Sequence, residues 1–176
     1  MGSYSVVGKS VPQIDAADKA TGIALFAGDL RLPGMLHAAV LRSPISHGRI
    51  GRIDGARARR LPGVKAVVTA ADTTGGRIGD IPDELVLAAD KVRFVGDEVA
   101  AVAAVDEYTA REALELIDVE YEELPAVFSP LEAMEGGAPL LHQAARNVAV
   151  QYPIVRGDVD GAFRRAACVL EHRFVT

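Results

Sequence analysis

Hydrophobic positions follow two different periods along the chain, and the clearest case places a strand directly before a helix. The stretch "VAAVAAV" at residues 99–105 is apolar at every position, which is typical of a strand covered on both faces. Apolar residues then recur at helical spacing, at Ala110, Ala113, Leu114 and Ile117. This spacing predicts an amphipathic helix over residues 107–117, with Asp106 as its N-cap. The following "DVEYEEL" at residues 118–124 is expected to form a half-exposed strand.

The same order of elements occurs earlier in the chain. "GRIGRID" at residues 48–54 reads as a strand, residues 54–61 as a brief helix capped by Asp54, and "VKAVVTA" at residues 64–70 as another strand. Crossover connections of this kind favour parallel strands, so we expect two parallel strand-helix-strand units. A further strand, "LHAAVLR" at residues 36–42, precedes them and should end at Ser43-Pro44, since proline cannot continue a central ladder.

The remaining segments carry weaker patterns. We expect an extended arm over residues 1–20, a loop over residues 72–82, and a short helix over residues 129–134. A capped helix is predicted at residues 158–166. Further short strands are predicted at residues 22–30, 85–88, 92–96, 147–156 and 168–176.

Composition narrows the class of protein. Hydrophobic residues make up 49% of the 176 residues, enough for a packed core, whereas aromatic residues make up 5%. No apolar run reaches the roughly 18 residues of a membrane span, and no secretory signal is visible. The single cysteine excludes an internal disulfide and fits a reducing compartment, so we expect a cytoplasmic protein without a membrane partner.

Charge does not point to a nucleic-acid partner. Residues 42–65 contain seven basic residues and one acidic residue, while the later half is acidic and the net charge is -5. No aromatic residue is interleaved with these arginines, although stacking on bases would need one. We therefore interpret the basic stretch as a solvated or protein-contacting face.

The histidines and serines do not assemble a recognisable reactive site. His37, His47, His142 and His172 lack the spacing that gathers zinc ligands. Ser43 and Ser46 lie near His47, but neither has the G-x-S-x-G context of a nucleophile elbow. We expect His37 to be a satisfied core or edge histidine and His47 to hydrogen-bond the Ser43-Pro44 turn.

Two neighbouring carboxylates and the cysteine remain as candidates for chemistry. Asp97 and Glu98 precede the apolar strand, and paired carboxylates can serve acid-base catalysis. A strand end that faces solvent is the simpler interpretation. Cys168 lies in an apolar stretch and is expected to be a small buried hydrophobe. The residues alone therefore indicate no catalytic, cofactor-binding or metal-binding position.

Several phrases occur together in an order that resembles a known family. They are "KATGIALFAGDLRLPGMLHAAVLRSPISHGRI", "LPGVKAVVTAAD", "LAADKVRFVGDEVAAVAA", "VEYEELPAV", "GDVDGAF" and "VLEHRFVT". The set resembles the N-terminal α/β hammerhead domain of the molybdenum-binding large subunit of the xanthine dehydrogenase and aldehyde oxidase family. Within that family, "VRFVGDEVAAVAAVDE" and "SPLEAMEGGAPLLH" look most like the α subunit of 4-hydroxybenzoyl-CoA reductase.

This resemblance implies a fold, cofactors and partners. The fold would be α+β, an α/β hammerhead with a mixed sheet, two strand-helix-strand units and short flanking helices. The holoenzyme would use molybdopterin cytosine dinucleotide, iron-sulfur clusters and often FAD, carried by a molybdopterin-binding domain or subunit, an iron-sulfur subunit and an FAD subunit. The family's molybdenum-contacting residues lie beyond residue 176, so the resemblance assigns no catalytic residue here.

The resemblance also leads to a function for this segment. We expect a non-catalytic docking domain, inactive by itself, in a molybdenum hydroxylase-type oxidoreductase acting on an aromatic, heteroaromatic or aldehyde substrate such as 4-hydroxybenzoyl-CoA. The turn from Arg42 to His47 would then belong to the interface with the molybdenum domain. The expected divisions are an arm at residues 1–20, a hammerhead core at residues 21–135 and a connecting segment at residues 136–176. The alternatives are a stand-alone binding or regulatory module of hammerhead fold, and an enzyme that uses Asp97, Glu98 and a histidine.

Overall fold

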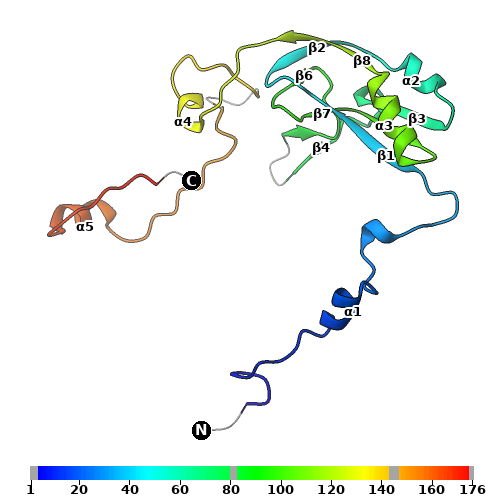
Figure 1. The fold of residues 1–176 in the computed structure, drawn as a ribbon. Helices are drawn as coiled ribbons and strands as arrows, with labels where there is room; N and C mark the ends of the chain where they lie inside the picture. The colour runs from blue at the N-terminus through cyan, green and yellow to red at the C-terminus, as the bar shows by residue number, and fades with distance from the viewer. Residues whose placement is uncertain (1–3, 80–82, 143–146, 175–176) are drawn as a thin grey trace. The chain divides into compact units, whose positions relative to one another are not determined.

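Short strands and short helices alternate along the chain in the computed structural model, which describes residues 4–79, 83–142 and 147–174 (Figure 1). The chain divides into two units. One contains the residues up to Ala39 together with Gly55–Val67 and Val102–Ile117. The other contains Val40–Asp54, Val68–Ala101 and the residues from Asp118 onward.

The strands form three small sheets. Strands β1 (His37–Arg42), β7 (Glu98–Ala104) and β3 (Val64–Thr69) form one sheet in the order β1-β7-β3. A second sheet has the order β6-β2-β8, and its strands are β6 (Lys91–Val92), β2 (Gly48–Asp54) and β8 (Asp118–Glu123). Strands β4 (Arg77–Ile78) and β5 (Glu84–Leu85) form a two-stranded antiparallel sheet.

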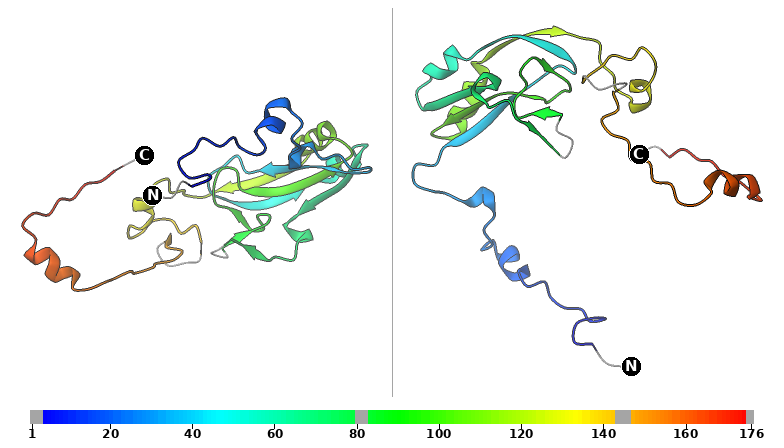
Figure 2. Two further views of the ribbon diagram at one scale, coloured as in Figure 1. Left: turned by 90° about the horizontal axis from the view of Figure 1, so that it is seen from below. Right: turned by 180° about the vertical axis from the view of Figure 1, so that it is seen from behind.

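Strand β2 is the centre of the second sheet and pairs antiparallel on both sides (Figure 2). Its register with β8 runs from Gly48 opposite Glu123 to Asp54 opposite Asp118, with an irregularity between Ile50 and Arg52. Buried Ala88, Val92 and Val99 form a core cluster for this unit, with partly buried residues packed on it: Ile45, Ile50, Ile53, Val119 and Tyr121. Strand β7 has both Val99 and Ala100 fully buried, which confirms the prediction that both of its faces are covered.

Two helices of the other unit contribute small residues to its core. Helix α2 (Ala56–Arg60) contributes Ala58, and helix α3 (Glu107–Glu115) contributes Ala110 and Ala113, all without exposed surface. Small side chains allow close packing where large ones would not fit, in keeping with the low aromatic content. A Cβ at Gly63 would lie 3.0 Å from Val105 and 3.1 Å from Thr109, so the turn before β3 also depends on a small residue.

Helix α3 begins as predicted, whereas helix α2 does not. The carboxylate of Asp106 accepts a hydrogen bond from the Thr109 backbone N–H at 2.8 Å, which confirms it as the N-cap of α3. The residue at the N-cap of α2 is Gly55, and the predicted cap Asp54 instead ends β2, where its carboxylate pairs with Arg52.

The prediction of parallel strand-helix-strand units is wrong. Strands β2 and β3 flank helix α2 but belong to different sheets, and β7 and β8 flank α3 but are also in different sheets. The rule for crossover connections applies only where both strands join one sheet. The mixed α/β class and the order of these elements are nevertheless as expected.

Among the described residues outside 37–123, helices form but strands do not. Helices α1 (Ala16–Thr21), α4 (Pro130–Ala133) and α5 (Val159–Arg165) are present, and the last two confirm predictions. The strands predicted at residues 22–30 and 147–156 are absent, as is any strand within the described part, 168–174, of the segment predicted at residues 168–176. Across the described residues, no helix combines the length and apolar character needed to cross a membrane.

Candidate functional site

The turn between β1 and β2 is fixed by hydrogen bonds on two sides. The Ser43 N–H donates to Asp97 O at 2.8 Å, and the Gly96 N–H donates to Ser43 O at 2.9 Å. The Ser43 hydroxyl is hydrogen-bonded to the backbone of Ile45, donating to its carbonyl at 2.8 Å and accepting from its N–H at 3.2 Å. The serine is 3% exposed and bonded within its own turn, so it forms no nucleophile–histidine pair with His47.

His47 anchors the chain that leaves β8. Its Nδ1 lies 2.7 Å from the Pro125 carbonyl oxygen, so this nitrogen carries the proton and donates it. The Leu124 N–H donates to the His47 carbonyl at 2.9 Å. The imidazole is 4% exposed, and its Nε2 has no hydrogen-bond partner among the described residues. The predicted hydrogen-bonding role is therefore structural, but its acceptor lies after β8 instead of in the Ser43-Pro44 turn.

The carboxylates of Asp97 and Glu98 have structural partners. Asp97 is 9% exposed, and its carboxylate accepts from the Arg93 backbone N–H at 2.8 Å, which closes the turn between β6 and β7. Burial raises the pKa of Asp97 above its usual value. Glu98 forms an ion pair with Arg42 at 2.6 Å. The expectation that both carboxylates face solvent is wrong for Asp97, which is buried in the turn, whereas the Glu98 side chain is 34% exposed.

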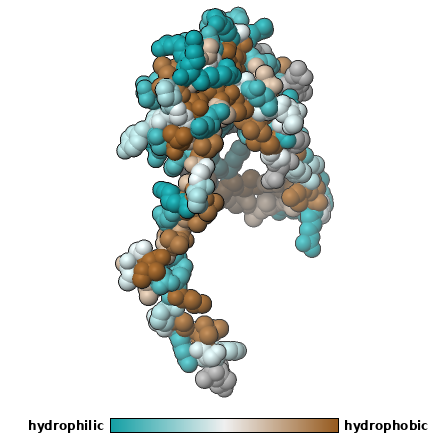
Figure 3. Space-filling view, turned by 90° about the vertical axis from the view of Figure 1, so that its right-hand side faces the viewer, coloured by the Kyte–Doolittle hydropathy of each residue, from teal (hydrophilic) through white to brown (hydrophobic). Residues whose placement is uncertain are grey.

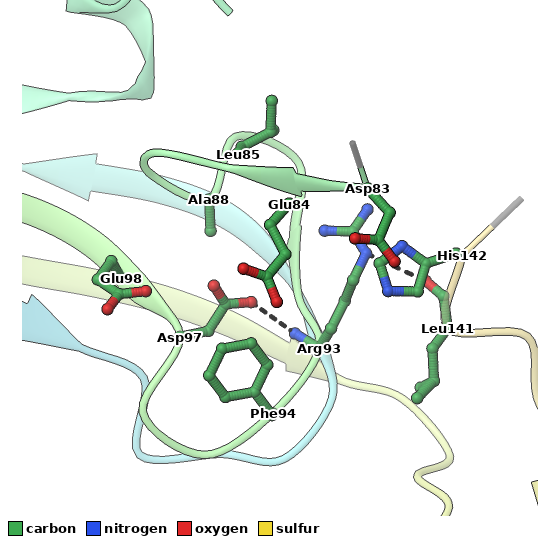
Figure 4. Close-up of a pocket in the computed structure, with 10 residues that line it drawn as sticks. All are labelled: Asp83, Glu84, Leu85, Ala88, Arg93, Phe94, Asp97, Glu98, Leu141 and His142. Atoms are coloured by element: carbon green, nitrogen blue, oxygen red, sulfur yellow. Dashed lines mark hydrogen bonds between the residues drawn. The ribbon is translucent and has the colours of Figure 1, made fainter. Parts of the chain in front are cut away.

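A pocket of about 220 Å³ lies beside this turn (Figure 4). Its charged lining consists of Asp83, Glu84, Arg93, Asp97, Glu98 and His142, and its apolar lining of Leu85, Ala88, Phe94 and Leu141. The Arg93 guanidinium donates from Nε to Leu141 O at 3.1 Å and from Nη1 to Lys91 O at 3.2 Å. Its donors are thereby directed at backbone carbonyls, and Arg93 holds the segment around residue 141 against β6.

Cations dominate one end of this pocket. Burial, with Arg93 as the largest charged contributor, lowers the pKa of His142 below 6.5, and Asp83 opposes this shift. Burial and Arg93 also lower the pKa of Lys91. Figure 4 shows the His142 ring beside Asp83 and the Arg93 side chain. His142 is therefore held in its neutral form near pH 7.

The described residues do not fit a metal or a phosphate-bearing cofactor. None of them form a group of three or more histidine, cysteine, aspartate or glutamate side chains able to hold a metal ion. The pocket has four carboxylates in its lining, and these repel an anionic dinucleotide. An iron-sulfur cluster bound by four thiolates would need more than the single cysteine of this chain.

The other candidate residues lie apart from the pocket. Cys168 is exposed, and the prediction of a buried position is wrong, because the strand predicted to contain it does not form in its described part, residues 168–174. His37 is partly buried in β1, and the His172 ring lies 6.3 Å from that of Phe174. The structure does bring Asp97 and Glu98 to one pocket with His142, the set that the enzyme alternative requires, but no serine or cysteine is among the residues that line it.

Comparison with known protein families identifies the family of this chain. Residues 21–125 match the family model described as "Aldehyde oxidase and xanthine dehydrogenase, a/b hammerhead domain". The chain belongs to this hammerhead family. The matched residues include all three sheets and helices α2 and α3.

Relatives with names extend the match beyond the hammerhead core. The nicotinate dehydrogenase large molybdopterin subunit of Eubacterium barkeri is 39% identical over 98% of this chain, and the match covers 41% of the relative. Subunit gamma of the 6-hydroxypseudooxynicotine dehydrogenase complex of Paenarthrobacter nicotinovorans is 38% identical over 97% of this chain and 23% of the relative. The chain therefore spans between a quarter and two fifths of the length of these relatives.

A solved structure supports the fold. The aldehyde oxidoreductase of Desulfovibrio gigas superposes with a TM-score of 0.78 and 35% identity, covering 89% of this chain and 19% of that protein. At this identity the likeness extends beyond the fold to common descent.

The sequence did not predict that Arg93 and His142 line this pocket. Arg93 bonds a carbonyl 48 residues away, and no local pattern reports such a contact. Only the unusual position of a cation between two apolar residues, in "VRFVG", could have marked Arg93 as a residue with a fixed partner.

Proposed function

We propose that this hammerhead chain is a non-catalytic docking domain of the molybdenum-binding large subunit of an oxidoreductase. The buried polar residues Ser43, His47 and Asp97 support this role, because each is engaged in holding the fold. Ser43 closes a turn, His47 anchors the chain after β8, and Asp97 closes the turn before β7. By itself the chain is expected to be inactive.

The observation that carries the proposal is the exposure of large apolar side chains in the terminal segments. Between residues 23 and 32 the exposed fractions are 69% for Ile23, 78% for Leu25, 60% for Phe26 and 68% for Leu32. In the C-terminal part, Tyr152, Ile154, Val155, Leu170 and Phe174 are all more than three quarters exposed. Hydrophobic side chains also appear among hydrophilic ones on the surface in Figure 3. Apolar surface of this extent marks an interaction site.

We propose that the partner of this apolar surface is a molybdopterin-binding domain or subunit. On this proposal residues 1–20 act as an arm, residues 21–135 as the hammerhead core, and residues 136–176 as the segment that leads toward that domain. The name of the Eubacterium barkeri relative, a large molybdopterin subunit, supports this choice. Iron-sulfur and FAD subunits would complete the holoenzyme, in the cytoplasm.

The substrate of the whole enzyme is proposed by class. Nicotinate dehydrogenase and aldehyde oxidoreductase are named for a heteroaromatic substrate and for aldehydes. We accordingly propose an aromatic, heteroaromatic or aldehyde substrate, and molybdopterin cytosine dinucleotide as the molybdenum cofactor. A specific match to 4-hydroxybenzoyl-CoA stays a prediction.

The test is to purify the tagged chain from its own cells and to measure molybdenum before and after the partners are dissociated. We expect molybdenum in the native complex and none on the separated chain. Stoichiometric molybdenum that remains on the separated chain would contradict the proposal. A complex without molybdenum would favour the alternative of a binding or regulatory module.

A pair of variants tests the apolar surface itself. The Phe26→Ser variant is expected to lower the molybdenum that co-purifies by about tenfold, since a buried phenylalanine contributes about 1.5–3 kcal/mol and 1.4 kcal/mol corresponds to tenfold. Tyr108→Ser is the control, because Tyr108 is 86% exposed on helix α3 and lies outside the exposed apolar segment at residues 23–32. An equal loss in both variants would show that residues 23–32 have no special role.

A further inference from the structure

Residues 139–142 are attached to strand β6 by side-chain donors. The Lys91 ammonium donates to Leu140 O at 3.4 Å, and the Arg93 Nε–H donates to Leu141 O at 3.1 Å. Both donors are positively charged, and both acceptors are backbone carbonyls. The attachment therefore depends on the position of two neighbouring cations.

Residues 139–142 are also held in shape by Asn147. Its side-chain oxygen accepts from the Leu141 N–H at 2.9 Å, and its amide nitrogen donates to Pro139 O at 2.8 Å and to Ala133 O at 3.0 Å. These bonds join residues of one stretch of chain to one another. They would persist if the stretch separated from β6, so residues 139–142 can move as a unit.

His142 ends this stretch and lies among charged groups. The groups that act on its protonation are Arg93, Lys91, Arg77 and Asp83, and the other acidic residues of the same pocket are Glu84, Asp97 and Glu98. Arg93 lines the same pocket as the imidazole; burial, Arg93, Lys91 and Arg77 lower the pKa of His142, and Asp83 raises it. A proton on His142 would add a further positive charge beside the two donors that hold the stretch.

We propose that residues 139–142 form an acid-sensitive latch, which separates from β6 when His142 takes up a proton. In the closed state the latch contributes Leu141 and His142 to the wall of the pocket. Its release opens the pocket beside Asp97, which is buried in the closed state, whereas Glu84 is already exposed. The neutral imidazole near pH 7 keeps the latch closed.

The direction of the pH effect follows from linkage. The pKa of His142 in the closed state lies below 6.5, the value of the free side chain. The open state therefore binds a proton more readily, and acid favours opening as the pH falls through about 6.5. The effect levels off below the lowered pKa of the closed state. With an open-state value of 6.5, the upper limit at pH 5 is roughly 30-fold in the opening equilibrium.

The experiment measures hydrogen exchange of the Arg93 Nε–H in the full chain by NMR between pH 7.5 and 5. This proton is the donor to Leu141 O, so its exchange reports release of the latch. Each rate is divided by that of the His142→Gln variant at the same pH, so that the intrinsic chemistry of exchange cancels. We expect the ratio to rise by at least about threefold toward pH 5.

Two further variants keep the proposal falsifiable. His172→Gln removes an exposed histidine and should behave as the wild type. Asp83→Asn removes the carboxylate that favours the protonated imidazole, and it should increase the response to acid. A flat ratio, an effect of His172→Gln equal to that of His142→Gln, or a weaker response in Asp83→Asn would each overturn the latch. None of these outcomes depends on the docking role.

Discussion

Apolar side chains occur both in residues 37–123 and in the terminal segments, residues 4–36 and 147–174. Only residues 37–123 form strands of more than two residues. Helices α1 and α5 do form in the terminal segments, while all the strands predicted there are absent. The difference reflects where hydrogen bonds close. A helix satisfies its backbone within one segment, whereas a strand needs a neighbour on at least one side. On the proposed docking role, the exposed apolar residues of the terminal segments form the surface that contacts the partner.

The largest effect that would test this contrast is expected at Gly48, where β2 meets β8. A Cβ at this position would lie 2.9 Å from the Glu122 carbonyl oxygen and would also collide with the Ile45 side chain. A paired backbone oxygen cannot move without breaking the ladder. Gly48→Ala should therefore lower the free energy of unfolding by about 3 kcal/mol, measured by urea denaturation.

The control for Gly48 lies three residues along the same strand. A Cβ at Gly51 would have its nearest neighbour, Glu120 O, at 3.6 Å, which is ordinary contact. Gly51→Ala is expected to change the stability by less than about 0.5 kcal/mol. Equal losses in the two variants would mean that the alanine side chain, and not the close approach of β8, is responsible.

Much of residues 37–123 could be predicted because local pattern and packing agree there. The unbroken apolar run of β7 predicted its two covered faces, and Asp106 predicted the start of α3. Sheet membership could not be predicted, because strands β2 and β3 join different sheets although their spacing suits one. Asp54 failed as a cap because Arg52 lies on the same strand and pairs with it.

The candidate site was less predictable than the fold. The adjacent positions of Asp97 and Glu98 did not predict the hydrogen bond that Asp97 accepts from the Arg93 N–H. They also did not predict the ion pair between Glu98 and Arg42. The Arg93 N–H is only four residues from Asp97 along the chain, whereas Arg42 is 56 residues from Glu98. Arg93 and His142 come together only after the chain has folded, so the periodicity of the sequence does not predict their contact with one pocket.

The same valine-to-alanine substitution, made once in each region, should change the free energy of unfolding by different amounts. Val102 is 1% exposed in β7, and Val155 is 76% exposed within residues 147–156, where the predicted strand is absent. Val102→Ala should cost about 2 kcal/mol of unfolding free energy, since it removes buried methyl groups and leaves a cavity. Val155→Ala should stay within about 0.5 kcal/mol. A comparable loss for Val155 would show that the C-terminal segment is packed in the isolated chain.

The smallest effect concerns the cap that begins α3. The Asp106 carboxylate accepts from the N–H and the hydroxyl of Thr109, and these hydrogen bonds lower its pKa below 3.8. A lowered folded-state pKa gives stability that is present above 3.8 and is lost as the pH falls through the folded value. Asp106→Ala should therefore lower the melting temperature at pH 7, and the difference from wild type should shrink below about pH 4. Glu112→Ala, on the exposed side of the same helix, should do neither; a difference for Asp106→Ala that stays constant with pH would show that the carboxylate's charge takes no part in capping, so that this helix would start by packing alone.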